Sequence, residues 1–287
     1  MLRWVGRQGG RSTWAAIART IAVAAAISCP GAASAQADDE TRDPNQSKYG
    51  WREVYGGVDA ARDQWLAYSG MTLAPFSPDI YSNGWRLRFG GGYGQYSYDT
   101  VGPHSNCGVA VLNDICTEDD RQRQRLKVSH SYAEALIGYY LELGRLTAKA
   151  FAGASMSTEH HLNGGDPNHS NDGTEFGAKG ALEFWLNTSD TSWSSLDLSY
   201  STARNETASR WRVGWRATPK VSIGPELRYD KNIETGDGAW NGRAGLFARY
   251  EWTGGEVSAA GGAAWWVDDW APKDPSVYGT VSVLFQY

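Results

Sequence analysis

Residues 277–287 of the chain read VYGTVSVLFQY, and their alternation indicates how the whole chain folds. Every second residue from Val277 to Tyr287 is apolar or a glycine, whereas the residues between are polar or tyrosine, with Leu284 as the exception. A period of two over about ten residues is typical of a β-strand whose two faces meet different environments. We therefore predict a strand with one apolar and one polar face.

The aromatic side chains at the end of this segment add a second indication. The sequence stops at Tyr287, two residues after Phe285. Such an end resembles the terminal strand of bacterial outer-membrane β-barrels, which the barrel-assembly machinery reads. We therefore predict that Phe285 and Tyr287 form an assembly signal, and that their strand pairs with the first strand of the chain to close a barrel.

Residues 1–35 have the three regions of a signal peptide in the expected order. They contain four arginines and no acidic residue, an apolar run at residues 21–27, and the small-residue pattern ASA at residues 33–35. The apolar run is too short to span a bilayer, which needs about 20 residues. A lipoprotein signal at Cys29 is the alternative, although its neighbours fit a lipidation box poorly.

The charge balance excludes one class of partner. Removal of residues 1–35 leaves 23 basic residues against 32 acidic ones, a net charge of −9. An acidic exported protein is a poor candidate for binding nucleic acid. No nucleic-acid partner is expected.

Two cysteines remain in the exported chain, Cys107 and Cys116. Outside the cytoplasm, a pair this close is predicted to form a disulfide that closes a loop. A redox or metal site is the alternative, and it would need tighter spacing or nearby histidines, which this stretch lacks.

The amino-acid composition favours a membrane barrel. The sequence has 34 glycines, 14 tryptophans and 15 tyrosines but only 7 phenylalanines, and after residue 35 no stretch approaches 18 apolar residues. Tryptophan and tyrosine suit membrane interfaces, and alternating strands suit a transmembrane barrel. We predict an all-β fold, an antiparallel transmembrane β-barrel. A soluble β-sandwich would explain the strands, but not the tryptophan excess or the terminal aromatic residue.

The predicted barrel occupies residues 49–287, after a polar, unpatterned stretch at 36–48 that we expect to be a flexible periplasmic lead-in. The two segments at 51–59 and 64–74 are the least clear, because both of their faces mix apolar and polar residues. Strand-like segments can be placed at about 51–59, 64–74, 85–98, 126–142, 146–159, 174–187, 193–202, 210–216, 221–230, 240–252, 257–267 and 277–287.

The connections between these twelve segments predict their topology. The links after the fourth, sixth, eighth and tenth segments are short turns, whereas those after the third, fifth, seventh, ninth and eleventh are longer and polar. Short turns on one side and long loops on the other are typical of outer-membrane barrels, and they place both termini on the periplasmic side. The link at 75–84 is the exception, because it is longer than a periplasmic turn needs. Twelve strands are predicted, with ten or fourteen as alternatives.

The faces opposite the apolar ones would fill the barrel, and they carry many charges. More of these charges are basic than acidic, and such a lumen could line a path for anions such as acidic sugars. The other interpretation is a narrow interior packed with paired charges, because unpaired buried charge is costly. The residues predicted to face the lumen include Arg86, Arg88, Glu134, Lys149, Lys179, Glu183, Arg210, Arg212, Arg216, Arg228, Arg243 and Arg249.

Catalytic and metal sites find little support in the sequence. His130 has the ingredients of a hydrolase nearby, but Ser129 and Ser131 would point to the opposite face, and Glu134 would lie about 13 Å away at ~3.3 Å per residue. A partner from a distant strand would be needed. The loop at 161–173 begins like a calcium loop, yet it lacks the required glycine and the final glutamate. No cofactor or metal site is expected.

Three stretches resemble a known family. They are WREVYGGVD at 51–59, DPN at 166–168 with GTEFGAK at 173–179, and GPELRY at 224–229. They are similar to the cellulose biosynthesis protein BcsS family of alphaproteobacteria, over about residues 50–287. The resemblance implies an outer-membrane protein encoded with bacterial cellulose synthesis components. It implies no catalytic residues, and the cysteine loop has no counterpart in it.

Three functions follow as hypotheses. The first is a non-catalytic accessory barrel in the cell outer membrane that helps cellulose or a related exopolysaccharide leave or attach to the cell. Its expected partners are outer-membrane lipid, the barrel-assembly machinery, cellulose or another glucan, and cellulose-secretion components. The second is a diffusion channel for small or acidic saccharides. The third is an outer-membrane lipid or glycan hydrolase that uses His130.

Overall fold

The computed structural model describes residues 50–101, 123–164, 172–232, 240–267 and 275–287. The signal peptide predicted at 1–35, the lead-in at 36–48, and both Cys107 and Cys116 lie outside these residues. No helix in the described ranges is long and apolar enough to cross a membrane.

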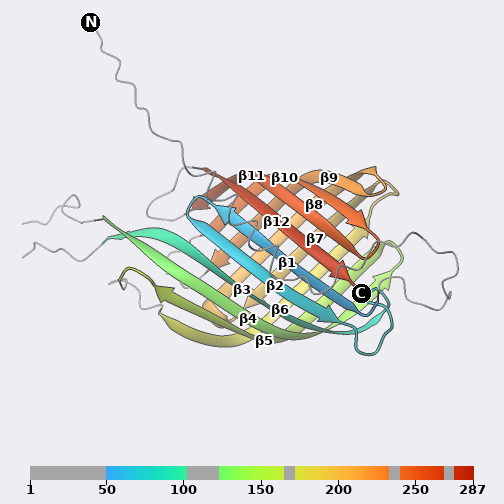
Figure 1. Cartoon of the computed structure of the whole chain (residues 1–287), viewed down its shortest axis with the longest axis horizontal. Helices are drawn as coiled ribbons and strands as arrows, with labels where there is room; N and C mark the ends of the chain where they lie inside the picture. The colour runs from blue at the N-terminus through green and yellow to red at the C-terminus, as the bar shows by residue number, and fades with distance from the viewer. Residues whose placement is uncertain (1–49, 102–122, 165–171, 233–239, 268–274) are drawn as a thin grey trace, which may run out of the picture. The chain divides into compact units, whose positions relative to one another are not determined.

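The described chain forms twelve antiparallel strands that close into a barrel, as the alternation predicts (Figure 1). Each strand is hydrogen-bonded to its sequence neighbours, and β1 is paired with β12. The strands are β1 (Arg52–Ala61), β2 (Gln64–Leu73), β3 (Gly84–Val101), β4 (Arg123–Leu143), β5 (Leu146–His161), β6 (Gly173–Asn187), β7 (Ser192–Ser201), β8 (Glu206–Thr218), β9 (Val221–Asn232), β10 (Trp240–Trp252), β11 (Gly255–Val267) and β12 (Ser276–Gln286).

The last strand closes the barrel against the first, which confirms the predicted seam. Gln286 lies opposite Glu53 at one end, and Tyr278 lies opposite Ala61 at the other. Closure leaves no strand edge exposed, so the backbone polar groups of the wall bond to one another, as a lipid environment requires.

Connections at the two ends of the barrel differ in length, with one departure from the prediction. The turns at 144–145, 219–220 and 253–254 are short, as expected. The link between β7 and β8, however, was predicted to be long and is only residues 202–205, because β8 begins at Glu206. The polar stretch that follows Asn205 alternates between the two faces and belongs to the strand.

Large apolar side chains cover the outside of the wall. Near the short turns, Trp85 and Tyr139 meet edge to face at 5.5 Å between ring centroids, and Trp252 and Phe285 do so at 5.9 Å. Trp85, Tyr139 and Phe285 are exposed, and Trp252 is half-buried. Aromatic rings at this level are typical of the interfacial girdle of a membrane barrel.

The long link between β2 and β3, residues 74–83, folds back onto the end of the barrel. The backbone N–H of Ile80 donates to the Gly50 carbonyl at 2.8 Å, and Ile80 is buried. The Tyr81 hydroxyl accepts a hydrogen bond from the Gln286 side chain, and the Tyr81 ring meets Tyr140 edge to face. This link is longer than a turn because it covers the interior, and we call it the periplasmic cap.

Candidate functional site

The interior of the barrel holds the candidate site. Strand alternation puts all twelve charged residues predicted for the lumen at inward-facing positions, while neighbours such as Trp85, Phe89 and Trp211 face outward and are exposed. Their contacts determine whether this interior is an open, charged path or a packed one.

A first group of ion pairs joins β3, β5 and β6. The Glu183 carboxylate lies 2.5 Å from Nη1 of Arg88 and 3.4 Å from Nζ of Lys149. The Arg88 guanidinium also lies over the Phe151 ring, 3.8 Å from its centroid. One carboxylate is therefore shared by two cations, and an aromatic ring covers one of them.

Two further pairs involve neighbouring parts of the wall. Glu134 of β4 forms an ion pair with Lys179 of β6, and Nζ of Lys179 lies 5.5 Å from the Tyr132 ring centroid. Nη2 of Arg210 lies 2.7 Å from Oδ2 of Asp197, whose strand β7 is adjacent. Each of these predicted bases therefore has an acidic partner.

A second group is centred on Glu226 of β9. Nε of Arg212 donates to this carboxylate at 2.6 Å, and the hydroxyl of Tyr278 donates to it at 3.1 Å. The other end of the Arg212 guanidinium donates to Oγ of Ser258 at 3.3 Å. These contacts connect β8 to β11 and β9 to β12, which in each case are three strands apart.

A third group is centred on Asp59 of β1. Nη1 of Arg243 lies 2.6 Å from the Asp59 carboxylate, and Nη1 of Arg228 lies 2.7 Å from it. The Thr280 hydroxyl of β12 donates to the same carboxylate at 3.3 Å. Asp59 was not predicted to face the lumen. Both faces of β1 mix apolar and polar residues, so the pattern does not indicate which face points inward.

Aromatic rings fill the end of the lumen near the short turns. The rings of Trp185 and Trp193 stack with centroids 4.0 Å apart, and the Arg249 guanidinium lies 4.7 Å from the Trp185 centroid. Arg249 also pairs with Glu251 at 2.9 Å and with Glu256. The stack and its cation thus occupy interior volume that an open pore would need.

Two of the predicted bases bind backbone and amide groups instead of carboxylates. The Arg86 guanidinium donates to the Ile80 carbonyl at 2.7 Å and also to the Ser82 carbonyl, so it holds the periplasmic cap in place. Arg216 donates to the Asn187 side chain at 2.7 Å and to the Asp190 carbonyl at 3.2 Å. These two side chains anchor connections at the short-turn end.

At the opposite end, the short link between β7 and β8 turns inward and buries Arg204. Its Nη1 lies 3.5 Å from Glu159 and 3.7 Å from Glu175, and its Nη2 donates to the Gly173 carbonyl at 2.8 Å. Arg204 adopts a left-handed backbone with φ 55°, which is uncommon for residues other than glycine. No strand pattern marks this residue, so sequence analysis did not find it.

Together these contacts place paired charges and stacked aromatic rings in the interior. A barrel of twelve strands about 4.8 Å apart and tilted by ~40° has a backbone diameter of about 24 Å. Pairs such as Arg88 with Glu183 and Arg243 with Asp59 connect strands three places apart, so each pair spans about a quarter of the wall. The geometry favours the packed interior over an open, cation-lined path.

The histidine considered for catalysis belongs to the same interior. Nδ1 of His130 lies 3.6 Å from Glu159, and Nε2 lies 4.0 Å from Glu206, so distant strands do bring carboxylates to it. In the described part of the chain, no serine hydroxyl is hydrogen-bonded to the ring. The neighbouring Ser129 hydroxyl instead donates to the His160 carbonyl at 3.3 Å.

No metal site is formed within the ranges that the structure describes. They contain no group of three or more His, Cys, Asp or Glu placed to hold a metal ion. Residues 165–171, which include most of the calcium-like stretch, lie outside them.

The two residues predicted as an assembly signal lie at the closing seam. Phe285 and Tyr287 both point outward and are exposed. The Tyr287 N–H donates to the Arg52 carbonyl at 3.0 Å, and the Arg52 N–H donates to the Tyr287 carbonyl at 3.1 Å. The end of the chain is thus tied to the start of β1 by a reciprocal pair of hydrogen bonds.

Comparison with protein families identifies the chain. The family model described as cellulose biosynthesis protein BcsS matches residues 54–287, which include all but the first residues of the barrel. The chain belongs to the BcsS family. This confirms the resemblance to this family that the sequence indicates, and it places the barrel in a family described by cellulose biosynthesis.

Comparisons with solved structures find only distant similarity, and comparison with curated sequences finds none. The KdgM porin is 10% identical with a TM-score of 0.42, and the match covers 82% of this chain and 99% of that one. The NanC porin is 8% identical with a TM-score of 0.40, covering 82% and 100%. The transport unit of the autotransporter AIDA-I from Escherichia coli is 10% identical with a TM-score of 0.43, covering 95% and 98%. No curated protein sequence matches the chain.

Proposed function

We propose that this member of the BcsS family is a non-catalytic accessory barrel of the outer membrane that supports the export or attachment of bacterial cellulose without being the conduit itself. The observation that carries the proposal is the set of ion pairs between strands three or four places apart, which are those of Glu183 with Arg88 and of Asp59 with Arg243 and Arg228. A growing glucan chain would have to break these pairs to pass.

Membership of the family supports the link to cellulose, and the outward apolar and aromatic side chains support an outer-membrane position. The signal peptide expected at residues 1–35 fits that location. In this role the barrel would serve as an anchor in the membrane, and its loops would meet the glucan or the secretion components. Exposed aromatic rings on those loops would stack on sugar rings.

The contacts of the lumen cations do not favour a diffusion channel. A path for acidic saccharides needs positive charge that is free to meet the solute. Arg88, Arg212, Arg228 and Arg243 instead lie within 2.7 Å of carboxylates. Each of these guanidinium groups is already held by a carboxylate.

A deletion strain tests the proposal. We expect the strain to make or display less cellulose than the wild type, measured as crystalline glucan recovered from washed cells and from the medium. Complementation should restore the wild-type amount. A variant with His130→Ala should complement as well as the wild type, because the proposed role needs no catalysis. A deletion strain with normal amounts in both fractions would refute the accessory role.

A further inference from the structure

Arg52 begins β1 at the closing seam, and it faces the outside of the barrel. Its sequence neighbour Glu53 is buried in the interior, so alternation turns the Arg52 side chain outward, where it is exposed. The reciprocal backbone hydrogen bonds with Tyr287 fix its position. Its location is therefore defined by the seam and does not depend on a loop.

The guanidinium of Arg52 is held between two aromatic rings. It lies 4.9 Å from the Trp51 ring centroid and 4.7 Å from the Tyr287 ring centroid. Within the described ranges, no carboxylate is close enough to form an ion pair with it. The lumen cations Arg88 and Arg243, in contrast, have acidic partners.

The surroundings of Arg52 on the outer surface are apolar. In the described strands, the other outward-facing positions at the short-turn end carry no charged residue. A cation alone in such a belt, at the level of the interfacial rings, is compensated best by an anionic group of the lipid itself. Arg is the residue best suited to phosphate, because its fork of N–H donors fits the phosphate oxygens.

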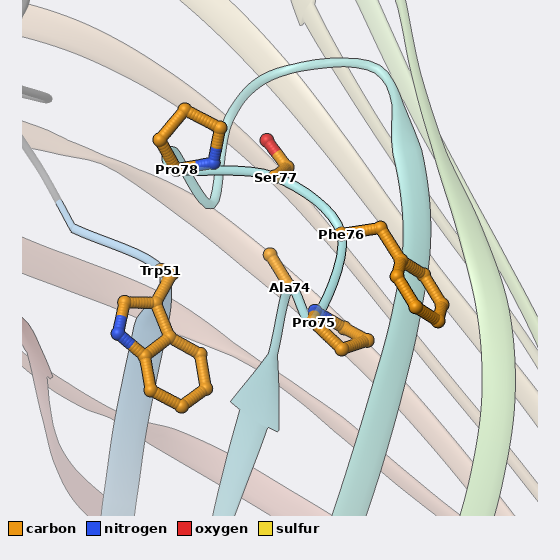
Figure 2. Close-up of a pocket in the computed structure, with 6 residues that line it drawn as sticks. All are labelled: Trp51, Ala74, Pro75, Phe76, Ser77 and Pro78. Carbon is orange, nitrogen blue, oxygen red and sulfur yellow. The ribbon is translucent and has the colours of Figure 1, made fainter.

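A hollow lies against Trp51, one of the two rings that contact Arg52 (Figure 2). It has a volume of about 330 Å³ and is lined by Trp51, Ala74, Pro75, Phe76, Ser77 and Pro78. Figure 2 shows the Trp51 and Phe76 rings on either side of Ala74 and Pro75. Phe76 is 84% exposed, which is costly for a phenylalanine in water but not for one against lipid. Trp51 is shared by the hollow and the cation site.

We propose that Arg52 and this hollow form a binding site for one anionic phospholipid of the periplasmic leaflet. The guanidinium binds the lipid phosphate, and the glycerol and upper acyl chain lie between Trp51 and Phe76. The site rests on the outer-membrane location proposed above, but not on any role in cellulose. A bound lipid would tie the start of β1 to the periplasmic cap, because its ligands come from both.

Native mass spectrometry of the purified full-length protein tests the site. The protein is released from detergent after titration with phosphatidylglycerol or phosphatidylethanolamine, and the first lipid retained is quantified. We expect Arg52→Gln to weaken phosphatidylglycerol retention about tenfold, the factor of one charge-assisted hydrogen bond. Phe76→Ser should weaken retention of both lipids. The matched control is Arg145→Gln, which removes an exposed arginine from the turn after β4 and should change nothing.

Three outcomes would overturn the proposal. Equal retention by the wild type and Arg52→Gln would show that the guanidinium does not bind the lipid. An equal loss in Arg145→Gln would show a general effect of charge. Displacement of the lipid by 10 mM inorganic phosphate would show a simple anion site, because free phosphate does not occupy the hollow. The measurement involves no cellulose, so a deletion strain with normal cellulose would leave it unaffected.

Discussion

The Asp59 carboxylate lies 2.6 Å from the Arg243 guanidinium, although their strands are three places apart around the barrel. Because β1 is one side of the closing seam, this contact ties β1 to a strand beyond β12, across the seam. The contact therefore both pairs charges inside the barrel and supports the closing seam.

Asp59→Asn should destabilise the barrel. The change keeps the shape of the side chain but leaves Arg228 and Arg243 without their shared carboxylate, and loss of one partner of a buried pair costs about 3–5 kcal/mol. We expect a lower urea midpoint in detergent micelles, followed by tryptophan fluorescence. Asp190→Asn is the control, because Asp190 is exposed and 4.0 Å from Arg145. Equal midpoints for the two variants would contradict this role of Asp59.

Gly214 should not tolerate a side chain. It is buried on the inward face of β8, where an added Cβ would meet the indole of Trp193. We expect Gly214→Val to cost about 1–3 kcal/mol through overpacking, again measured as the free energy of unfolding in urea. Gly180→Val is the matched control, because the space around Gly180 is open on the outward face of β6. A Gly214→Val variant as stable as Gly180→Val would show that the Trp193 packing is wrong.

Release of the periplasmic cap should make the barrel leaky. Arg86 binds the cap through the carbonyls of Ile80 and Ser82, and Arg86→Gln removes most of these hydrogen bonds. In planar bilayers we expect brief current bursts from this variant that the wild type does not show. Lys220→Gln, in an exposed turn at the same end, should behave like the wild type. A silent Arg86→Gln variant would mean that the lumen contacts alone suffice to close the barrel.

Removal of residues 285–287 should impair insertion into the outer membrane. The deletion removes the partners of Arg52, Glu53 and Val54 at the seam, together with both aromatic rings of the predicted assembly signal. Fractionated membranes should contain less folded protein, detected by its heat-dependent shift on gels. Tyr287→Phe keeps the ring and should assemble normally. Normal assembly of the truncated chain would contradict the interpretation of this segment.

Much of the wall could be predicted from the sequence, because a strand between lipid and a polar interior must alternate. β8 and β12 show this most clearly. β1 and β2 were less clear, because tyrosines and glycines occupy their inward positions and the glycines leave space for rings. Gly57 and Gly70, for example, are covered by Tyr68 and Tyr55.

The pairing within the interior could not be predicted. Which carboxylate meets which guanidinium depends on the position of each strand around the closed wall, and alternation says nothing about that. Asp59 was not predicted because it lies on a strand whose faces are ambiguous. Arg204 was not predicted because it lies in a link, where no alternation marks an inward position. The short link at 202–205 was expected to be long, because its polar residues resemble those at the start of β8.

Single-channel recording of the wild-type protein in a planar bilayer tests the central claim most directly. Because the pairs of Glu183 and Asp59 join strands three or four places apart inside the barrel, we predict no steady open current at moderate voltage in either salt or acidic oligosaccharide. A stable ohmic conductance that acidic oligosaccharides block would contradict the filled interior and would favour a saccharide channel instead.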